Sequence, residues 1–445
     1  MIRRTLASYA QSALYLSALS LHAQPQAQQA VISSSKLSPV VVDVTPGAVC
    51  TLRGQDDSGA VRSLILYAND QGQVQFHAQA HAETSNPAKL DLQCAAGGTF
   101  TEHSIQLKVD STLAAAQPAA LRAPSGPAAH VRPALTGNPQ AISPEELASL
   151  GYPVRPDAVQ EPEAYATWLR MVTTPTTMVQ SHTVAQAGRT HAPAPPSPIK
   201  PGNLPQSTSF LNWSGFAVYQ DGRVLDPVPL KPYVVVSGEW VVPSVTGEPN
   251  VQDDSAFWVG MDGFNTGDVL QDGTEQQAFS INIIGVQFSI TSYYGWAEFF
   301  PLYEQRITNF TVRPGDHMLG VVWMADSAGT PSVSGTTGIC YLQNLTTGIG
   351  TFSYIAPPPG TVFTGSTAEW IMERPTVNGA FTDLSDYSAA SMFNAYATRT
   401  DGTTVNASGN TNSVNIAMVD NGWKPMSEVA PISDTWMVFQ WLAFK

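Results

Sequence analysis

The sequence has few charged residues, and few of these are basic. Asp, Glu, Lys and Arg make up 13% of the 445 residues, against roughly 25% in ordinary soluble domains. Glycine and proline, which favour turns, each occur 34 times, and this combination indicates a mainly β protein. The net charge of -14 argues against nucleic acid or a membrane surface as a partner, because both are bound through clustered Lys and Arg.

Beyond the first 23 residues, no segment is both long enough and apolar enough to cross a membrane. The N-terminus has Arg3 and Arg4, then a moderately apolar run, then the small residue Ala23, which is the layout of a secretory signal. We therefore expect a signal peptide over residues 1–23 and a secreted, extracellular protein. An uncleaved N-terminal tail is the alternative.

Cysteine is also scarce, with three in the whole chain. Strand alternation over residues 48–52 and 90–94 places Cys50 and Cys94 on apolar faces. In an exported chain this favours a Cys50–Cys94 disulfide over two free thiols, with about 4 kcal/mol of stabilisation from loop closure. Residues 31–113, a series of short strands separated by turns, are expected to form a small immunoglobulin-like β-sandwich.

The middle of the chain has a different character. Residues 114–139 are rich in Ala and Pro and are expected to form a linker. Within residues 140–206, capping residues predict one helix over 143–151, and a second helix is expected from Pro162, with Trp168 on its apolar stripe. Two short helices cannot bury a core alone, so we expect them to pack on the domain that follows.

Residues 207–445 read as strands separated by Gly, Asn, Asp and Pro turns, which predicts a large antiparallel β-sandwich of the concanavalin or jelly-roll kind. His317 is the only histidine in this region. There is no GxSxG or HExxH motif, and the scattered carboxylates match no EF-hand loop. A Ser-His or Cys-His nucleophile, a metal site and a cofactor are therefore not expected.

The carboxylates of this region occupy unusual strand positions. In STAEWIMERP, residues 366–375, alternation places Ala368, Trp370 and Met372 on a core face and Glu369 on the opposite face beside an isoleucine. An acid in partly apolar surroundings loses solvation, so it needs partners or a function.

Two other strands repeat an aromatic residue and an acid on the face away from the core. Residues 255–263 and 293–301 pair Trp258 with Asp262 and Trp296 with Glu298, while Gln271 stands beside a tight turn. Taken singly, each acid is more simply a solvated surface residue. Together they predict a curved sheet whose exposed face is a groove for an extended polymer.

The motifs of this region are similar, in order, to those of the eqolisin-type glutamic peptidases. They are NWSG (212–215), SGEWVVPS (237–244), AFWVGMDG (256–263), VLQDG (269–273), YGWAEFFP (294–301), QNLTTG (343–348) and TAEWIMERP (367–375). The resemblance covers nearly all of the region from Phe210 onward. It implies two packed antiparallel sheets with a concave, peptide-binding face.

The resemblance also implies residue roles. Gln271 of the LQxG element and Glu369 of the AEW element would be the catalytic pair. Four residues would line or support the groove: Trp258, Asp262, Trp296 and Glu298. Glu275 and Tyr294 stand where the family tends to have Asp.

The chemistry of amide hydrolysis suits this pair. Glu369 can take a proton from water and later deliver it to the leaving nitrogen, while the Gln271 amide orients the water and stabilises the oxyanion. We expect an acid-acting, monomeric endopeptidase that acts on peptides or proteins. By the same resemblance, residues 140–206 are a pro-segment that covers the groove until cleavage between Gly188 and Phe210.

Two other functions fit parts of the pattern. A carbohydrate-binding or glycoside-hydrolysing jelly roll would use Glu298 and Glu369 as its two acids, and a non-enzymatic adhesin would use neither. Gln271 discriminates between the enzymes, because a glycosidase would tolerate its loss better than the peptidase.

Overall fold

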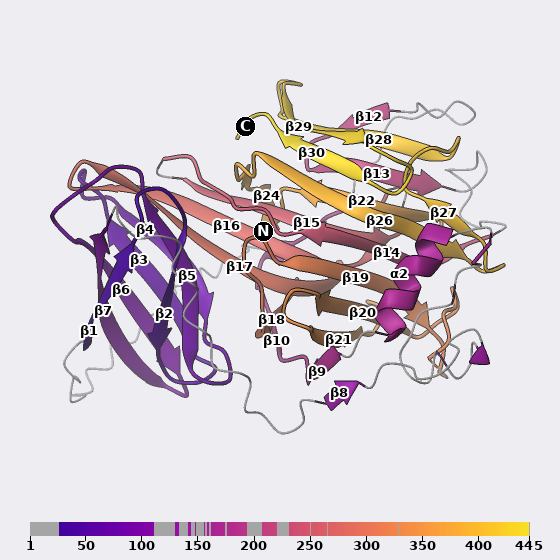
Figure 1. Ribbon diagram of the computed structural model, residues 1–445, viewed down its shortest axis with the longest axis horizontal. Helices are drawn as coiled ribbons and strands as arrows, with labels where there is room; N and C mark the ends of the chain where they lie inside the picture. Colours follow the sequence, from indigo (N-terminus) through magenta and orange to yellow (C-terminus); the bar gives the residue numbers. More distant parts are fainter. Residues whose placement is uncertain are drawn as a thin grey trace, which may run out of the picture.

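The computed structural model describes most of the chain (Figure 1). The described residues are 26–110, 130–132, 141–143, 147, 155, 158–159, 162–173, 176–193, 207–219, 231–249, 251–264, 266–327 and 329–444. The expected signal peptide and nearly all of the expected linker lie outside these ranges. Nearly every described element is a strand, so the prediction of a mainly β fold is confirmed. None of the helices in these ranges has the length and apolar composition of a membrane-crossing segment.

The C-terminal region consists of two packed layers of strands. The first layer follows the pairing order β18 (Gln305–Thr311), β17 (Val286–Phe300), β16 (Val269–Ile283), β15 (Gln252–Met261), β22 (Thr367–Glu373), β13 (Trp213–Tyr219) and β28 (Ser413–Val419). The second follows β21 (Ile349–Ile355), β20 (Thr337–Asn344), β19 (His317–Ala325), β14 (Tyr233–Val241), β26 (Ala389–Arg399), β30 (Met437–Trp441) and β29 (Pro425–Pro431). Pairing of β28 with β29 joins the layers. Shorter strands at the edges are β12 (Ser207–Phe210), β23 (Thr376–Val377), β24 (Ala380–Phe381), β25 (Asp383–Leu384) and β27 (Thr404–Asn406).

The main core lies between these layers. Ala368, Trp370 and Met372 of β22 are fully buried in it together with Phe257 and Val259 of β15. The core face predicted for 366–375 is therefore confirmed, and the alternate residues of the same strands point to the opposite surface.

The front region has its own five-stranded sheet, in the order β1 (Gln26–Ile32), β7 (Thr99–Val109), β6 (Ala88–Ala96), β3 (Val49–Gln55) and β4 (Val61–Tyr67). Cys50 and Cys94 are directly opposite each other on β3 and β6. They form the predicted disulfide.

The front region is completed by the C-terminal region. Its second layer contains β2 (Ser38–Asp43) and β5 (Gln73–Ala80), and β5 pairs with β17, with Ala80 opposite Phe288. The long β16–β17 hairpin extends between the front strands (Figure 1) and buries Phe279, Ile281 and Ile290 in the front core. Periodicity within the front segment alone gave no sign of this shared core.

The middle segment lies along the C-terminal layers. The helix expected at Pro162 is confirmed as α2 (Pro162–Thr173), and Trp168 is buried in the main core. The helix expected over 143–151 lies mostly outside the described residues, although Leu147 N donates a hydrogen bond to Ser143 O. Short strands then join several edges: β8 (His130–Arg132) pairs with β9 (Thr176–Gln180), β9 with β21, β10 (Thr183–Ala185) with β18, and β11 (Arg189–Thr190) with β23.

Candidate active site

Four strands of the first layer bring the predicted catalytic pair into one row. Gly260 of β15 is paired on one side with Gln271 of β16 and on the other with Glu369 of β22, and Gln271 is paired in turn with Glu298 of β17. Residues paired across neighbouring strands share a face. Because Ala368 is in the core, this face is the surface away from it. Gln271 and Glu369 are thus two strand spacings apart, roughly 10 Å between Cα atoms, with no side chain between them.

The next row of paired residues on this face contains two tryptophans. Gly273 lies between Trp258 and Trp296, and both indoles are fully buried. Trp258 packs edge-on against Trp213 with ring centroids 5.0 Å apart and donates a hydrogen bond from Nε1 to Glu373 Oε2 at 2.8 Å. The aromatic residues predicted to line a groove therefore lie beside the row that contains Gln271 and Glu369.

Burial changes the chemistry of the central carboxylate. Glu369 is 0% exposed, and burial raises its pKa well above the ordinary range, with a further rise from the charge of Asp262. Among the described residues, neither Glu369 oxygen nor Gln271 Oε1 has a hydrogen-bond partner in good geometry, although looser contacts with the Thr367 hydroxyl and the Phe264 backbone partly offset the rise in the pKa of Glu369. Acceptors of this kind are suited to hold a water molecule.

Asp262 holds the turn that leads into β22. It adopts a positive φ of 66°, and its carboxylate accepts backbone hydrogen bonds from Thr364, Gly365 and Ser366 at 2.7, 3.2 and 2.7 Å. These contacts fix the turn just before Glu369. The predicted supporting role of Asp262 stays a prediction.

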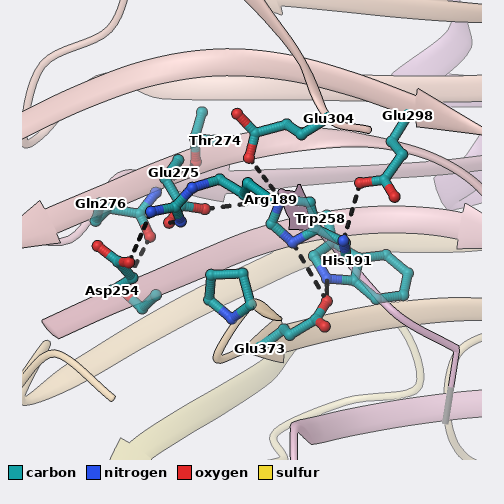
Figure 2. Close-up of polar contacts among 12 residues, drawn as sticks. Arg189, His191, Asp254, Trp258, Thr274, Glu275, Gln276, Glu298, Glu304 and Glu373 are labelled. Atoms are coloured by element: carbon teal, nitrogen blue, oxygen red, sulfur yellow. Dashed lines mark hydrogen bonds and ion pairs between the residues drawn. The ribbon is translucent and has the colours of Figure 1, made fainter. Parts of the chain in front are cut away.

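A peptide segment from the middle of the chain contacts this site, and Figure 2 shows its residues Arg189 and His191 among several carboxylates. Gln271 Nε2 donates a hydrogen bond to the backbone carbonyl of His191 at 2.8 Å. Glu298 Oε2 accepts the backbone N–H of His191 at 2.9 Å, and Asn212 Nδ2 donates to the carbonyl of Ala192 at 3.1 Å. The groove residues therefore bind the segment by its main chain.

The side chain of His191 is held between acids and an indole. Its ring stacks on Trp296 at 3.7 Å, Nε2 lies 3.0 Å from Glu304 Oε2, and Nδ1 lies 3.5 Å from Glu373 Oε2. Burial alone would lower the pKa of His191, but the hydrogen bonds and charges of Glu304, Glu373 and Glu298 outweigh it and raise that pKa well above its ordinary value. These contacts favour the protonated form of the ring.

Arg189 makes a second set of ionic contacts. Nη1 donates to Glu275 Oε1 and Nη2 to Asp254 Oδ2, each at 2.8 Å. Burial raises the pKa of Glu275 even beside this guanidinium. Arg189 and His191 thus bring two positive charges into a groove that is rich in carboxylates.

The Peptidase A4 family model matches residues 212–437 of this chain, about half of its length. The chain belongs to the peptidase A4 family. The predicted eqolisin-type identity is confirmed, and the protein is a glutamic endopeptidase, a hydrolase of peptide bonds. Aspergillopepsin-2 from Aspergillus niger is 25% identical over 251 residues, which cover 50% of this chain and 78% of the relative.

Solved structures with similarity include two glutamic peptidases. Scytalido-glutamic peptidase with a transition state analog inhibitor is 21% identical, with a TM-score of 0.41, covering 52% of this chain and 98% of that chain. Aspergilloglutamic peptidase from Aspergillus niger is 23% identical, with a TM-score of 0.34, covering 43% of this chain and 99% of that chain.

Sequence reasoning missed several residues that the structure places at this site. Glu373 could have been predicted as a site residue, because strand alternation places it on the same face as Glu369. Asp254 and Glu304 carried no local signal. Arg189 and His191 lie at the end of the middle segment, and their place in the groove depends on long-range pairing of β11 with β23.

Two clusters have donor atoms that a divalent cation could use. One is His191, Glu275 and Glu304, and the other is Glu248, Asp253 and Asp383. In the first cluster, the two acids already form ion pairs within the chain: Glu275 with the Arg189 guanidinium and Glu304 with the His191 ring. His317, outside both, begins β19 and lies 2.7 Å from Glu239 Oε2.

Proposed function

We propose that this A4-family enzyme is a secreted, acid-acting endopeptidase in which Gln271 and Glu369 form the catalytic dyad. The observation that carries the proposal is the hydrogen bond from Gln271 Nε2 to a peptide carbonyl, 2.8 Å long, in the same row of the sheet as Glu369. Gln271 thus already binds a peptide carbonyl by the hydrogen bond that an oxyanion would need, and Glu369 lies two strands away on the same face of the sheet.

The reaction follows from these positions. Glu369 takes a proton from water, and the hydroxide oxygen attacks the carbonyl carbon. The carbonyl oxygen becomes an oxyanion, which the Gln271 NH2 group stabilises by a hydrogen bond that strengthens as charge develops. Glu369 then transfers the proton to the nitrogen, the C–N bond breaks, and a carboxylic acid and an amine leave.

The pH dependence depends on whether the groove is covered. With the segment in place, burial keeps the pKa of Glu369 high, so the residue holds its proton and is a poor base. When the segment leaves, water enters and the pKa falls towards that of a solvated glutamate, about 4.3. Activity of the open enzyme is therefore expected in the acid range.

The segment around Arg189 and His191 supports a zymogen. It occupies the groove by main-chain hydrogen bonds and ion pairs, which would exclude a substrate until it is released. We expect maturation by cleavage between Gly188 and Phe210. The N-terminal signal over 1–23 and the Cys50–Cys94 disulfide, which persists in oxidising compartments, support secretion.

The alternative glycosidase pair has less support. Glu298 and Glu369 are separated by Gln271 and Gly260 in the row, which is three strand spacings or roughly 14 Å between Cα atoms. Glycosidases place their two carboxyl groups about 5 to 10 Å apart. Glu298 also accepts a backbone N–H of the bound segment at 2.9 Å, a contact that suits peptide recognition.

Digestion of denatured casein between pH 3 and 5 tests this function. The wild-type protein should cleave it in the presence of a pepstatin-type inhibitor and a chelator. Gln271→Ala should lower kcat/KM by about a hundredfold or more, the loss typical of one oxyanion donor. Glu428→Gln, which removes an exposed carboxylate, is the matched control and should behave as wild type. Full activity of Gln271→Ala would refute the dyad.

A further inference from the structure

Arg189 occupies a site built for a cation. Its side chain is 9% exposed, and the Asp254 and Glu275 side chains that contact it are fully buried. The two carboxylates come from neighbouring strands, β15 and β16, and each binds a different nitrogen of the guanidinium at 2.8 Å. Gln252 Nε2 also donates to the other oxygen of Asp254 at 3.3 Å, which helps to hold its orientation.

The position of this site relative to the dyad is defined by the bound chain. The carbonyl that Gln271 binds belongs to His191, and Arg189 precedes that residue by two positions. If this carbonyl occupies the place of a scissile bond, Arg189 marks the subsite for the side chain two residues on the N-terminal side.

Resting on the proposed function, we propose that Asp254 and Glu275 form a specificity subsite for an arginine two residues before the residue whose peptide bond is cleaved. Two buried carboxylates without a cation are unfavourable, so a substrate that brings a guanidinium binds better than a neutral one. Substrates of the mature enzyme would thus repeat the spacing of Arg189 and His191.

The geometry selects arginine over lysine. Two acceptors on separate side chains match the fork of a guanidinium, whereas an ammonium is a single point charge. Tyr294, paired with Glu275 across the sheet, adds an aromatic wall to this region. On that wall the guanidinium of Arg306 stacks with its carbon 3.9 Å from the ring centroid.

Matched peptides test the subsite. Quenched fluorescent peptides with the sequence of residues 188–195 would carry arginine, lysine, citrulline or alanine at the position of Arg189. Citrulline keeps the shape of arginine without its charge. The full-length protein incubated at pH 5 should show a kcat/KM about tenfold or more higher for arginine than for citrulline, as expected for buried charge-assisted hydrogen bonds, with lysine between them. Mass spectrometry should place the cut after the histidine.

Variants then assign the preference to the two acids. Glu275→Gln and Asp254→Asn should each reduce the ratio of arginine to citrulline to about threefold or less, whereas Glu428→Gln should keep the wild-type ratio. If either variant fails to fold, the arginine-to-citrulline ratio of the wild-type protein and the pH dependence of this ratio still test the proposal.

The proposal also predicts how the arginine-to-citrulline ratio of kcat/KM changes with pH. The ratio should fall as pH decreases from 6 to 3, because the carboxyl group of Glu275, once protonated, cannot form an ion pair with the guanidinium. Tyr294 stays neutral and Arg306 stays charged over this range. The histidine is present in every peptide, so it cancels in the ratio.

The outcomes separate the two proposals. If the wild-type protein cleaves all four peptides, but its kcat/KM values for the arginine and citrulline peptides differ by no more than about twofold, the subsite proposal is overturned and the peptidase function stands. A cut that does not place arginine two residues before the cleaved residue would also overturn it. Activity no higher than that of a Glu369→Gln protein would refute both.

Discussion

At the scale of single residues, the site depends on a glycine. Gly260 separates Gln271 and Glu369 in the row, and a Cβ added there would lie 2.8 Å from Trp258 Cζ3 and 3.1 Å from Gln271 Cβ. Contacts that short are not tolerated without movement of the neighbours. The space between the dyad residues therefore exists because this position has no side chain.

Gly260→Ala should lower kcat/KM by about a hundredfold or more, because a shift of about 1 Å in a catalytic group has that effect. The free energy of unfolding should fall by only about 1–3 kcal/mol, the usual range for overpacking. Kinetics and thermal melting measure the two effects. Gly267→Ala is the control, because nothing lies within 4 Å of its added Cβ. Activity of Gly260→Ala equal to that of Gly267→Ala would contradict this geometry.

Residue-level prediction succeeded where strand alternation was enough. The two faces of residues 366–375 follow from a period of two, and so does the shared face of Trp296 and Glu298. It failed for Arg189 and His191, because their contacts with acids far along the chain have no local pattern.

At the scale of elements, the segment that contains β11 contacts the residues of the site, and in the zymogen proposed above it excludes the substrate. Its cations are held by carboxylates, and burial raises the pKa of Glu298 and Glu373 above their ordinary range. As the pH falls, these acids lose their charge before a solvated acid would, whereas His191 remains charged. The electrostatic hold on the segment therefore weakens on acidification.

The double variant Arg189→Gln/His191→Gln should release the segment at a higher pH than wild type. With Glu369→Gln in every protein to prevent self-cleavage, cleavage of the released segment by an added protease, followed by gel electrophoresis between pH 3 and 7, should begin about one pH unit higher or more, since roughly one unit corresponds to 1.4 kcal/mol of lost interaction. His182→Gln is the control, because this histidine is 54% exposed and pairs with Asp70 outside the groove. Equal cleavage of all three proteins at every pH would refute the electrostatic latch.

Elements that pair far along the chain were the hardest to predict. The front segment reads as an independent sandwich, yet Phe279 and Ile290 of the β16–β17 hairpin complete its core. Hydrophobic periodicity predicts that a strand has a buried face, but not which distant strand covers it. Cys50 and Cys94 were paired correctly because both lie in nearby strands with the same apolar environment.

At the scale of the whole molecule, the acidic excess lies in the C-terminal region. From Ser207 onward there are 8 Lys and Arg against 22 Asp and Glu, and several acids are buried. Burial raises the pKa of Asp253 to about 7, with additional contributions from Asp383, Asp254 and Glu248, and it raises that of Asp268 to about 6. Burial lowers the pKa of His77 to about 4, which acts in the opposite direction, but the acids with a raised pKa are more numerous. The folded protein thus binds more protons than the unfolded chain between about pH 4 and 7.

Stability should consequently decrease as the pH rises from 4 to 7. A pKa raised from 3.8 to about 7 corresponds to at most about 4 kcal/mol lost over this range, and Asp253→Asn should remove much of the loss. Chemical denaturation at pH 4, 5.5 and 7 measures the effect, with Glu428→Gln as the control. An unfolding free energy that stays constant or rises towards pH 7 would contradict this account.

The central claim is that Glu369, rather than the neighbouring acid Glu298, exchanges the proton with water. The most direct test compares kcat/KM of Glu369→Gln and Glu298→Gln on the arginine peptide at the optimal pH of the wild type. We predict a loss of about a thousandfold or more for Glu369→Gln, as expected for removal of a general base. Glu298→Gln should lose much less, because its amide oxygen can still accept the substrate N–H. Near-normal activity of Glu369→Gln, with Glu298→Gln inactive, would contradict the claim.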